Sequence, residues 1–198
     1  QSGGSAGKSL PVAVVLLKND FSPPSNYFYL RQESLSEFTG VRLGQVTDKD
    51  IRYDNFRGFP SGESKLDVVP PEDYRKQIDG EVRLLSFHTS PFGIESILEY
   101  APAVNPRPTT FVRSYSFVSS ALTIDYQDMF QYSIGNPDWS DEEWEHYLKT
   151  PDDHRYKQLA EKIKSELPFQ WHDNGFAKAV RVKLFLDENT KYTKQVDH

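Results

Sequence analysis

The stretch TTFVRSYSFVSS, residues 109–120, alternates apolar and polar side chains and is rich in aromatic and β-branched residues. Successive side chains of a β-strand point to opposite faces, so this period of two predicts a strand. The stretch GEVRLLSFH, residues 80–88, has the same pattern and a similar composition. Both stretches are therefore predicted to be strands.

Shorter strand-like stretches lie around these two. LPVAVVLLK, residues 10–18, is predicted to be a buried strand, because it is short, rich in valine and followed by the breaker NDFSPPS. Three further stretches are predicted to form strands: NYFYLRQES (26–34), SEFTGVRLGQV (36–46, two strands around Thr39-Gly40) and DMFQYSI (128–134). Residues 47–79 are rich in Asp, Pro, Gly and Ser and are predicted to form a long loop, with a helical turn starting near Pro71.

The last third of the chain has helical signals instead. SDEEWEHYLK predicts a helix with Ser140 as its N-cap and Glu143 completing a capping box. YLKTPDDHRYKQLAEKIKSELP predicts a second helix with Thr150 as N-cap, Pro151 in the first turn and Pro168 after its end. A third helix is expected over roughly 176–187, and a short strand or extended exit over 190–196.

These patterns predict an α+β protein. No regular helices separate the predicted strands, so we expect an antiparallel β-sheet or sandwich followed by a small C-terminal helical segment. The predicted organisation is a Gly/Ser-rich linker or artificial leader (1–9), a β-rich accessory domain (10–136) and a helical segment (137–198). The last two helices are expected to bury four side chains between them: Leu159, Ile163, Val180 and Leu184.

Composition limits the classes of function. The chain has 198 residues and a net charge of -6 without a basic stripe, so a nucleic-acid partner is not expected. It has no cysteine, which excludes thiolate metal sites and a cysteine nucleophile within this stretch. Direct membrane insertion is not expected, because the longest apolar run is too short to span a bilayer. The absence of cysteine fits an extracytoplasmic domain, and a cytosolic one almost as well.

No catalytic, metal or cofactor site is expected from the residues. One acidic cluster lies at a predicted helix start, where capping explains it better than the opposed pair that glycoside hydrolysis needs; its members are Asp138, Asp141, Glu142, Glu143 and Glu145. The five histidines have no metal-ligand spacing, and no serine has a nucleophile-elbow context. The loop GFPSGES, residues 58–64, lacks the strand and helix that frame a phosphate loop.

Aromatic residues give the one candidate binding face. Period-two alternation places Tyr27, Tyr29 and Arg31 on one side of the predicted strand 26–34. Four further aromatic residues could extend a sugar-binding surface: Phe38, Tyr53, Phe56 and Phe59. Aromatic residues at alternate strand positions are more often core or cross-strand pairs, and that alternative stays open.

Several stretches resemble one family. YFYLRQESLSEFTGVRL (27–43), FVRSYSFVSSAL (111–122), YLKTPDDHRYKQLAEKI (147–163) and AKAVRVKLFLDENTKYT (177–193) are similar to the extracytoplasmic region that precedes the catalytic core of bacterial transglutaminase-like membrane proteins. The last two stretches resemble the entry helices of the transglutaminase fold, with the pair Leu159 and Ala160 and the later pair Tyr192 and Thr193. In that family the cysteine, histidine and aspartate of the catalytic triad follow downstream, so no triad residue is assigned here.

The resemblance implies a non-catalytic accessory region of a papain-like (transglutaminase-like) protein, on the extracytoplasmic side of a bacterial membrane. Its partner would be the catalytic domain of its own chain. The alternative is a β-sandwich binding module for a glycan or a peptide, and a stand-alone hydrolase using the acidic cluster is a third hypothesis. No turnover of transglutaminase, protease or amidase substrates is expected from these residues.

Overall fold

The computed structural model describes residues 10–40, 42–46, 56, 58–66, 73–137 and 139–191. The chain forms two compact units: unit 1 comprises Gln1–Ser36 and Gln45–Ile124, and unit 2 comprises Glu37–Gly44 and Asp125–His198. Antiparallel sheets and three α-helices confirm the predicted α+β class. The hairpin at Glu37–Gly44 was expected with the β-rich region, but it belongs to unit 2 with the helices.

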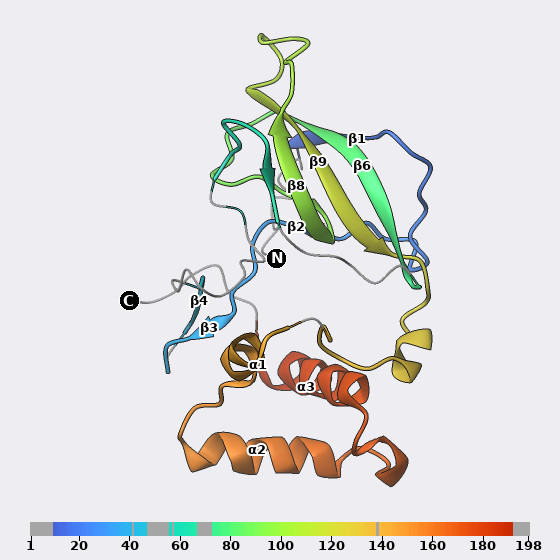
Figure 1. Cartoon of the computed structure of the whole chain (residues 1–198), viewed down its shortest axis with the longest axis vertical. Coiled ribbons are helices and arrows are strands. Elements are labelled where there is room, and N and C mark those ends of the chain that lie inside the picture. The colour runs from blue at the N-terminus through green and yellow to red at the C-terminus, as the bar shows by residue number, and fades with distance from the viewer. Residues whose placement is uncertain are drawn as a thin grey trace, which may run out of the picture. The chain divides into compact units, whose positions relative to one another are not determined.

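Unit 1 is built on a five-stranded antiparallel sheet with the strand order β1-β6-β9-β8-β5 (Figure 1). Two long strands, β6 (Arg75–Leu84) and β9 (Arg113–Leu122), pair along their whole length at its centre. The other strands are β1 (Ala13–Leu17), β8 (Ser96–Pro102) and β5 (Ser64–Lys65). A second, two-stranded sheet pairs β2 (Leu30–Arg31) with β7 (Gly93–Ile94).

The core of unit 1 lies on one face of the large sheet. Alternate residues of β6, from Ile78 through Val82 to Leu84, are almost completely buried. The facing residues of β9 include Tyr115 and Phe117, and Phe117 lies opposite Gly80 in the register. The absence of a side chain at Gly80 makes room for the Phe117 ring, which an added Cβ would strike. The alternation of apolar and polar residues in the stretches 80–88 and 109–120 therefore does mark strands of a sheet with one buried face.

Unit 2 carries the helices and a small hairpin. The α-helices are α1 (Asp141–Leu148), α2 (His154–Ser165) and α3 (Gly175–Asn189), with short 3₁₀ helices η1 (Asp128–Gln131) and η2 (Phe169–Trp171). The hairpin pairs β3 (Glu37–Phe38) with β4 (Leu43–Gly44) around Gly40, which has a left-handed φ of 91°. The expected turn at Thr39-Gly40 and the three expected helices are both present.

Of the two predicted helix caps, the one at Ser140 is confirmed and the one at Thr150 is wrong, and the cap of α3 was not predicted. Ser140 caps α1, accepting a hydrogen bond from the Glu143 N–H, while the Glu143 carboxylate accepts one from the Ser140 N–H at 2.8 Å. Asn174 caps α3 through the Ala177 N–H. The expected cap of α2 at Thr150 is wrong: Asp153 accepts from the Arg155 N–H instead, because the helix begins three residues further on.

Several predicted strand boundaries are also wrong. Strand β6 begins at Arg75, inside the predicted loop, and is continuous with the stretch 80–88 as far as Leu84. In the stretch 26–34 only Leu30–Arg31 are in a strand. The predicted last strand at 128–134 is the 3₁₀ helix η1, where Phe130 packs between Trp171 and Phe176 at centroid distances of 5.1 Å. Strand β8 was not predicted at all, and the expected exit strand lies mostly outside the described residues.

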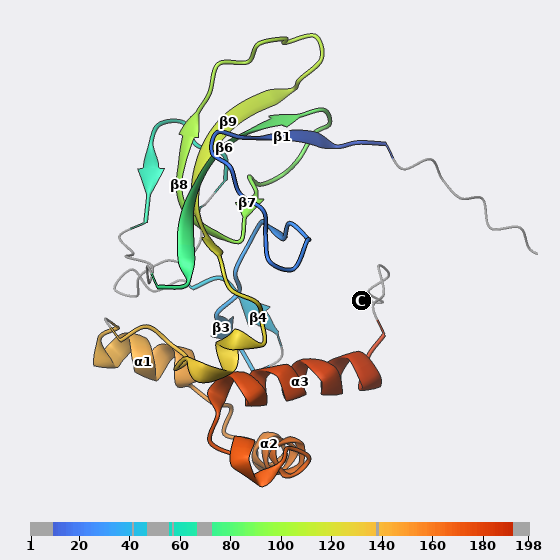
Figure 2. The ribbon, with the colours of Figure 1, turned by 90° about the vertical axis from the view of Figure 1, so that its right-hand side faces the viewer.

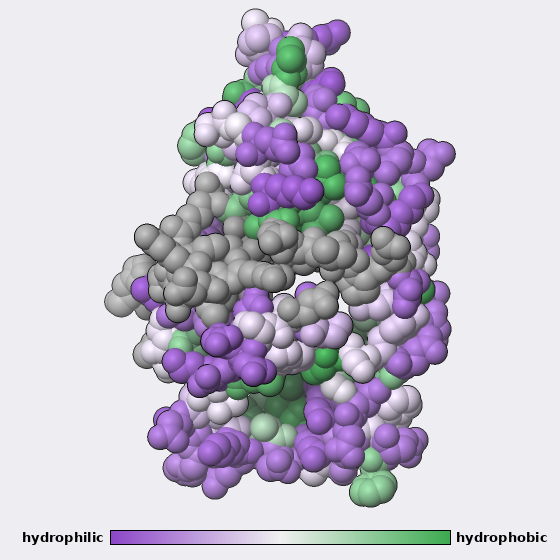
Figure 3. Space-filling view, in the orientation of Figure 1, coloured by the Kyte–Doolittle hydropathy of each residue, from purple (hydrophilic) through white to green (hydrophobic). Residues whose placement is uncertain are grey.

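The expected cluster between α2 and α3 is wrong for two of its four residues. Ile163 is buried and Val180 is half-buried, but Leu159 is 37% exposed and Leu184 is 45% exposed. Ile163 and Ala177 are the buried residues of these two helices, so the contact between them is narrow. Figure 3 shows hydrophobic residues at the surface in the region of the helices. An apolar stripe at helical spacing is wider here than the surface that the partner helix covers.

Candidate ligand pocket

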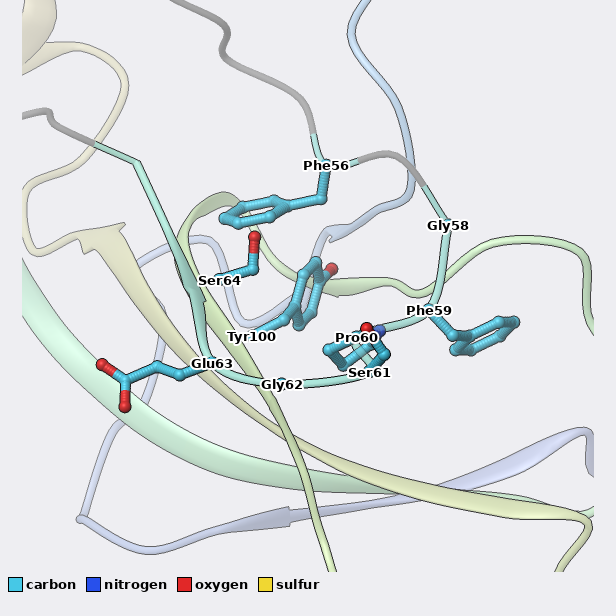
Figure 4. Close-up of a pocket in the computed structure, with 9 residues that line it drawn as sticks. All are labelled: Phe56, Gly58, Phe59, Pro60, Ser61, Gly62, Glu63, Ser64 and Tyr100. Carbon is cyan, nitrogen blue, oxygen red and sulfur yellow. The ribbon is translucent and has the colours of Figure 1, made fainter.

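A pocket lies in unit 1 beside the short strand β5, where the loop at 58–64 curves over β8 (Figure 4). Its volume is about 310 Å³, at the lower end of the range of small-molecule sites. The lining residues are Phe56, seven residues of the loop and one residue of β8: Phe56, Gly58, Phe59, Pro60, Ser61, Gly62, Glu63, Ser64 and Tyr100. Loop hydroxyls and backbone groups thus line the pocket together with three aromatic residues, Phe56, Phe59 and Tyr100.

Local sequence explains the course of this loop. Gly58 has a φ of 73°, in the left-handed region that glycine adopts at no steric cost. Pro60 fixes its own φ, and Gly62 has open space around the position of a Cβ. The loop then enters β5, where Ser64 pairs with Tyr100 of β8. This pairing places the end of the loop directly beside the Tyr100 side chain.

Aromatic contacts connect the pocket to the core. The Phe56 ring meets Tyr100 edge-on with a centroid distance of 4.7 Å, and Phe59 meets Tyr115 at 5.6 Å. Tyr100 and Tyr115 are themselves in edge contact at 5.6 Å. The Arg113 guanidinium lies 4.2 Å from the centroid of the Phe59 ring, close enough for a cation–π interaction. The rings of the pocket are therefore held by packing on the sheet.

The two buried tyrosines have different polar environments. The Tyr115 hydroxyl donates to the Phe92 carbonyl and accepts from the Phe92 N–H, both at 3.0 Å. The Tyr100 hydroxyl is buried and has no hydrogen-bond partner among the described residues. Burial raises the pKa of both phenols well above the ordinary value; nearby Tyr115 raises that of Tyr100 further, and nearby Arg31 opposes this. Both side chains therefore stay neutral in the folded protein.

The pocket offers little acid–base chemistry. Glu63 is the one carboxylate among its described lining residues, and in Figure 4 its side chain extends away from the rings of Phe56 and Tyr100. No group of three or more carboxylates and histidines in the described part of the chain could hold a metal ion. The sequence has no cysteine, so a cysteine-protease triad is absent. The described lining therefore brings one carboxylate and no histidine to the pocket.

The predicted binding face lies elsewhere in unit 1. Tyr27 and Tyr29 precede β2 and are 70% and 64% exposed, whereas Arg31 lies within β2 and is half-buried. Between the two tyrosines, Phe28 contacts Phe21 edge-on at 6.1 Å. Whether Tyr27, Tyr29 and Arg31 bind a ligand together stays a prediction.

Two of the other aromatic residues named from the sequence line the pocket, namely Phe56 and Phe59. Phe38 belongs to unit 2, where its ring meets Tyr156 of α2 at 5.9 Å, and Tyr53 lies outside the described residues. Tyr100 was missed, because a bulge between Ile97 and Glu99 breaks the alternation of β8. On the two sides of this bulge, Ile97 and Tyr100 are both buried although they are three positions apart, an odd separation that regular alternation would place on opposite faces.

Comparison with protein-family models, with curated proteins and with solved structures found no match to this chain. The resemblance to transglutaminase-like proteins therefore stays a hypothesis. None of the helices in the described ranges combines the length and the apolar character needed to cross a membrane.

Proposed function

We propose that this chain is a non-catalytic binding region whose pocket beside β5 takes a small, hydroxyl-rich ligand of carbohydrate type. The observation that carries the proposal is the composition of the pocket: the ring of Phe56, which packs on the buried ring of Tyr100, lines it together with the hydroxyls and backbone of the loop at 58–64. A sugar ring presents an apolar C–H face and a polar edge of hydroxyls. It can contact both kinds of surface at once.

The charges of the pocket favour binding over hydrolysis. Cleavage of a glycosidic bond needs two carboxyl groups that face each other across the substrate, about 5–9.5 Å apart. The described lining of the pocket has Glu63 alone. A bound sugar would accept hydrogen bonds from backbone N–H groups, and its hydroxyls would donate to and accept from the hydroxyls of Ser61 and Ser64. The described lining offers no pair of carboxyl groups to protonate a leaving group and activate water.

A screen against immobilised polysaccharides and a glycan array tests this function. Phe56→Ala removes one aromatic wall, and we expect it to abolish the binding seen with the unchanged chain. Phe28→Ala is the matched control, because it removes a half-exposed phenylalanine that does not line the pocket. Tyr29→Ala tests whether the glycan binds at the face of Tyr27, Tyr29 and Arg31 instead of in the pocket. Binding that is lost in Tyr29→Ala and kept in Phe56→Ala, or no binding to any glycan, would contradict the proposal.

A second proposal concerns unit 2. We propose that it forms a docking surface for the catalytic domain of a transglutaminase-like protein, on the extracytoplasmic side of the membrane. The exposed apolar residues of α2 and α3 support it, in particular Leu159 and Leu184, which lie on the stripes that should meet a partner. In such a protein a thiolate would attack a carboxamide, activated by an imidazole that a carboxylate orients.

The reading frame that encodes this chain decides the second proposal. Beyond the codon for His198 we expect a Gly-Cys stretch followed by a histidine and an aspartate. A frame that continues without them would contradict this role and leave the binding function as it stands.

A further inference from the structure

The two edges of the large sheet in unit 1 differ in how they are protected. Strand β5 has two residues, Ser64 and Lys65, and follows a loop with a proline and two glycines, which are features that keep a sheet edge from pairing with another chain. Strand β1, at the opposite edge, has five residues of the sequence AVVLL without a charge or a proline, and its flanking residues include Pro11 and Lys18. Figure 2 shows β1 at this edge of the sheet. An exposed apolar edge strand of this kind can accept a further strand.

Hydrogen bonds define which backbone groups of β1 are available. The Leu85 N–H donates to the Val12 carbonyl, and the Lys18 N–H donates to the Asp79 carbonyl, both in register with the ladder between β1 and β6. In an antiparallel ladder such pairs alternate, so Val14 and Leu16 also direct their N–H and C=O groups to β6. The same groups of Ala13, Val15 and Leu17 point outward, and no described residue bonds to them.

The side chains of β1 follow the same alternation. Ala13, Val15 and Leu17 are half-buried against the core, whereas Val14 and Leu16 are exposed on the other face of the sheet. The free backbone groups thus belong to residues with inward side chains. A strand added at this edge would extend the core on one face, and would meet Val14 and Leu16 on the other.

We propose that β1 pairs with β1 of a second copy of this chain, antiparallel about a two-fold axis at Val15, so that two sheets become one continuous sheet. In this register Ala13 lies opposite Leu17 of the second copy and Val15 lies opposite its own equivalent. Each of these pairs exchanges both backbone hydrogen bonds. On the exposed face, Val14 of each copy lies opposite Leu16 of the other copy.

The chemistry of the edge favours a second copy as the occupant. The outward backbone groups are spaced symmetrically about Val15. The N–H and C=O groups of one β1 can therefore pair with the same groups of β1 in a second copy, as an isologous interface requires. Among the described residues, Lys18 is the charged residue nearest to either end of β1, and the register places it opposite Val12 of the second copy. No like charges face each other, although each whole chain carries a net charge of -6.

Two variants that differ at one position test the register. Val14→Lys with Leu16→Lys puts two lysines opposite each other across the axis, whereas Val14→Glu with Leu16→Lys puts a glutamate opposite a lysine. Within one chain, position 14 lies beside Arg83 and position 16 beside Glu81, so the second variant is also compatible with β6. The two-lysine variant changes the net charge from -6 to -4, so overall repulsion between chains cannot explain a weaker dimer. Val104→Lys with Val112→Lys adds the same charges at exposed positions away from β1.

Val15→Pro is a variant of a different kind. It removes an N–H that points outward, and it breaks no bond to β6, so the chain should keep its fold while losing the central hydrogen bonds of the pair. Near-ultraviolet circular dichroism establishes that each variant is folded before its mass is measured.

Sedimentation equilibrium over a range of protein concentrations gives the mass of each chain in solution. We expect twice 22.8 kDa for the unchanged chain, for the glutamate–lysine variant and for the Val104/Val112 control, and 22.8 kDa for the two-lysine variant and for Val15→Pro. Hydrogen exchange should be slowed in the dimer at the amides of Ala13, Val15 and Leu17. A monomeric unchanged chain would overturn the proposal, as would a dimer that survives in the two-lysine variant. A dimer that both charge variants abolish would overturn the register.

Discussion

The hydroxyl of Tyr115 makes two hydrogen bonds to the backbone of one residue, Phe92, donating to its carbonyl and accepting from its N–H at 3.0 Å each. Both residues are buried, and the bonds join β9 to the segment before β7. The neighbouring Tyr100, with its ring in contact with Tyr115, has no such partner among the described residues. Two tyrosines of one core therefore differ in whether their polar atom is satisfied.

Replacement of each tyrosine by phenylalanine should separate these roles. Tyr115→Phe leaves the N–H and C=O of Phe92 buried without their partner, and we expect a loss of about 1–3 kcal/mol in the free energy of unfolding. Tyr100→Phe removes an unpaired buried hydroxyl, so its stability should equal or exceed that of the unchanged chain. Urea unfolding followed by circular dichroism measures both, and equal losses would contradict the assignment of the hydrogen bonds.

Alkaline pH should destabilise unit 1. Burial raises the pKa of Tyr100 and Tyr115 in the folded state above the ordinary 10.0, so above pH 10 the unfolded chain loses protons that the folded chain keeps. Stability is therefore full below pH 10 and falls as the pH rises further, by roughly 1.4 kcal/mol per pH unit for each such group. Tyr100→Phe should show a shallower fall. A fall of unchanged slope in that variant would show that Tyr100 ionises freely in the folded state.

Gly80 should not tolerate a side chain. A Cβ at this position would lie 2.6 Å from a carbon of the Phe117 ring and 3.0 Å from the Leu16 carbonyl oxygen. Gly80→Ala should therefore lower the free energy of unfolding by about 1–3 kcal/mol, as overpacked cores do. Gly62→Ala is the control, since open space surrounds its position. Thermal melts in which Gly80→Ala and Gly62→Ala have the same melting temperature would contradict the packing of Phe117 over Gly80.

Catalytic turnover by this chain is not expected. The sequence has no cysteine, and Glu63 is the one carboxylate among the described residues of the pocket. Incubation with a dansyl amine and a glutamine-rich acceptor protein, alongside a general peptidase substrate, should give no product. Saturable turnover that survives repurification and disappears on a single substitution would contradict a non-catalytic role.

The sequence predicts the regular parts of this fold better than its irregular parts. Alternation marks β9 and the second half of β6, and side-chain caps mark α1, because these signals are local. Strand β8 is hidden by its bulge, and the aromatic alternation of 128–134 is used in a 3₁₀ helix whose Phe130 packs on α3. Of the residues that line the pocket, Phe56 and Phe59 could be named as candidates from the sequence. Tyr100 lies beside them only because β5 pairs with β8. That pairing links positions far apart in the sequence.

The central claim is that the pocket beside β5 binds a carbohydrate, and NMR tests it most directly. The ¹⁵N-labelled chain is titrated with an oligosaccharide taken from the glycan screen, and the shifts of backbone amides are followed. We expect saturable shifts at the amides of Gly58, Ser61, Gly62 and Ser64, with smaller shifts at Tyr27 and Tyr29, and their loss in Phe56→Ala. Shifts confined to residues 27–31, or absent from the loop at saturating ligand, would contradict the claim.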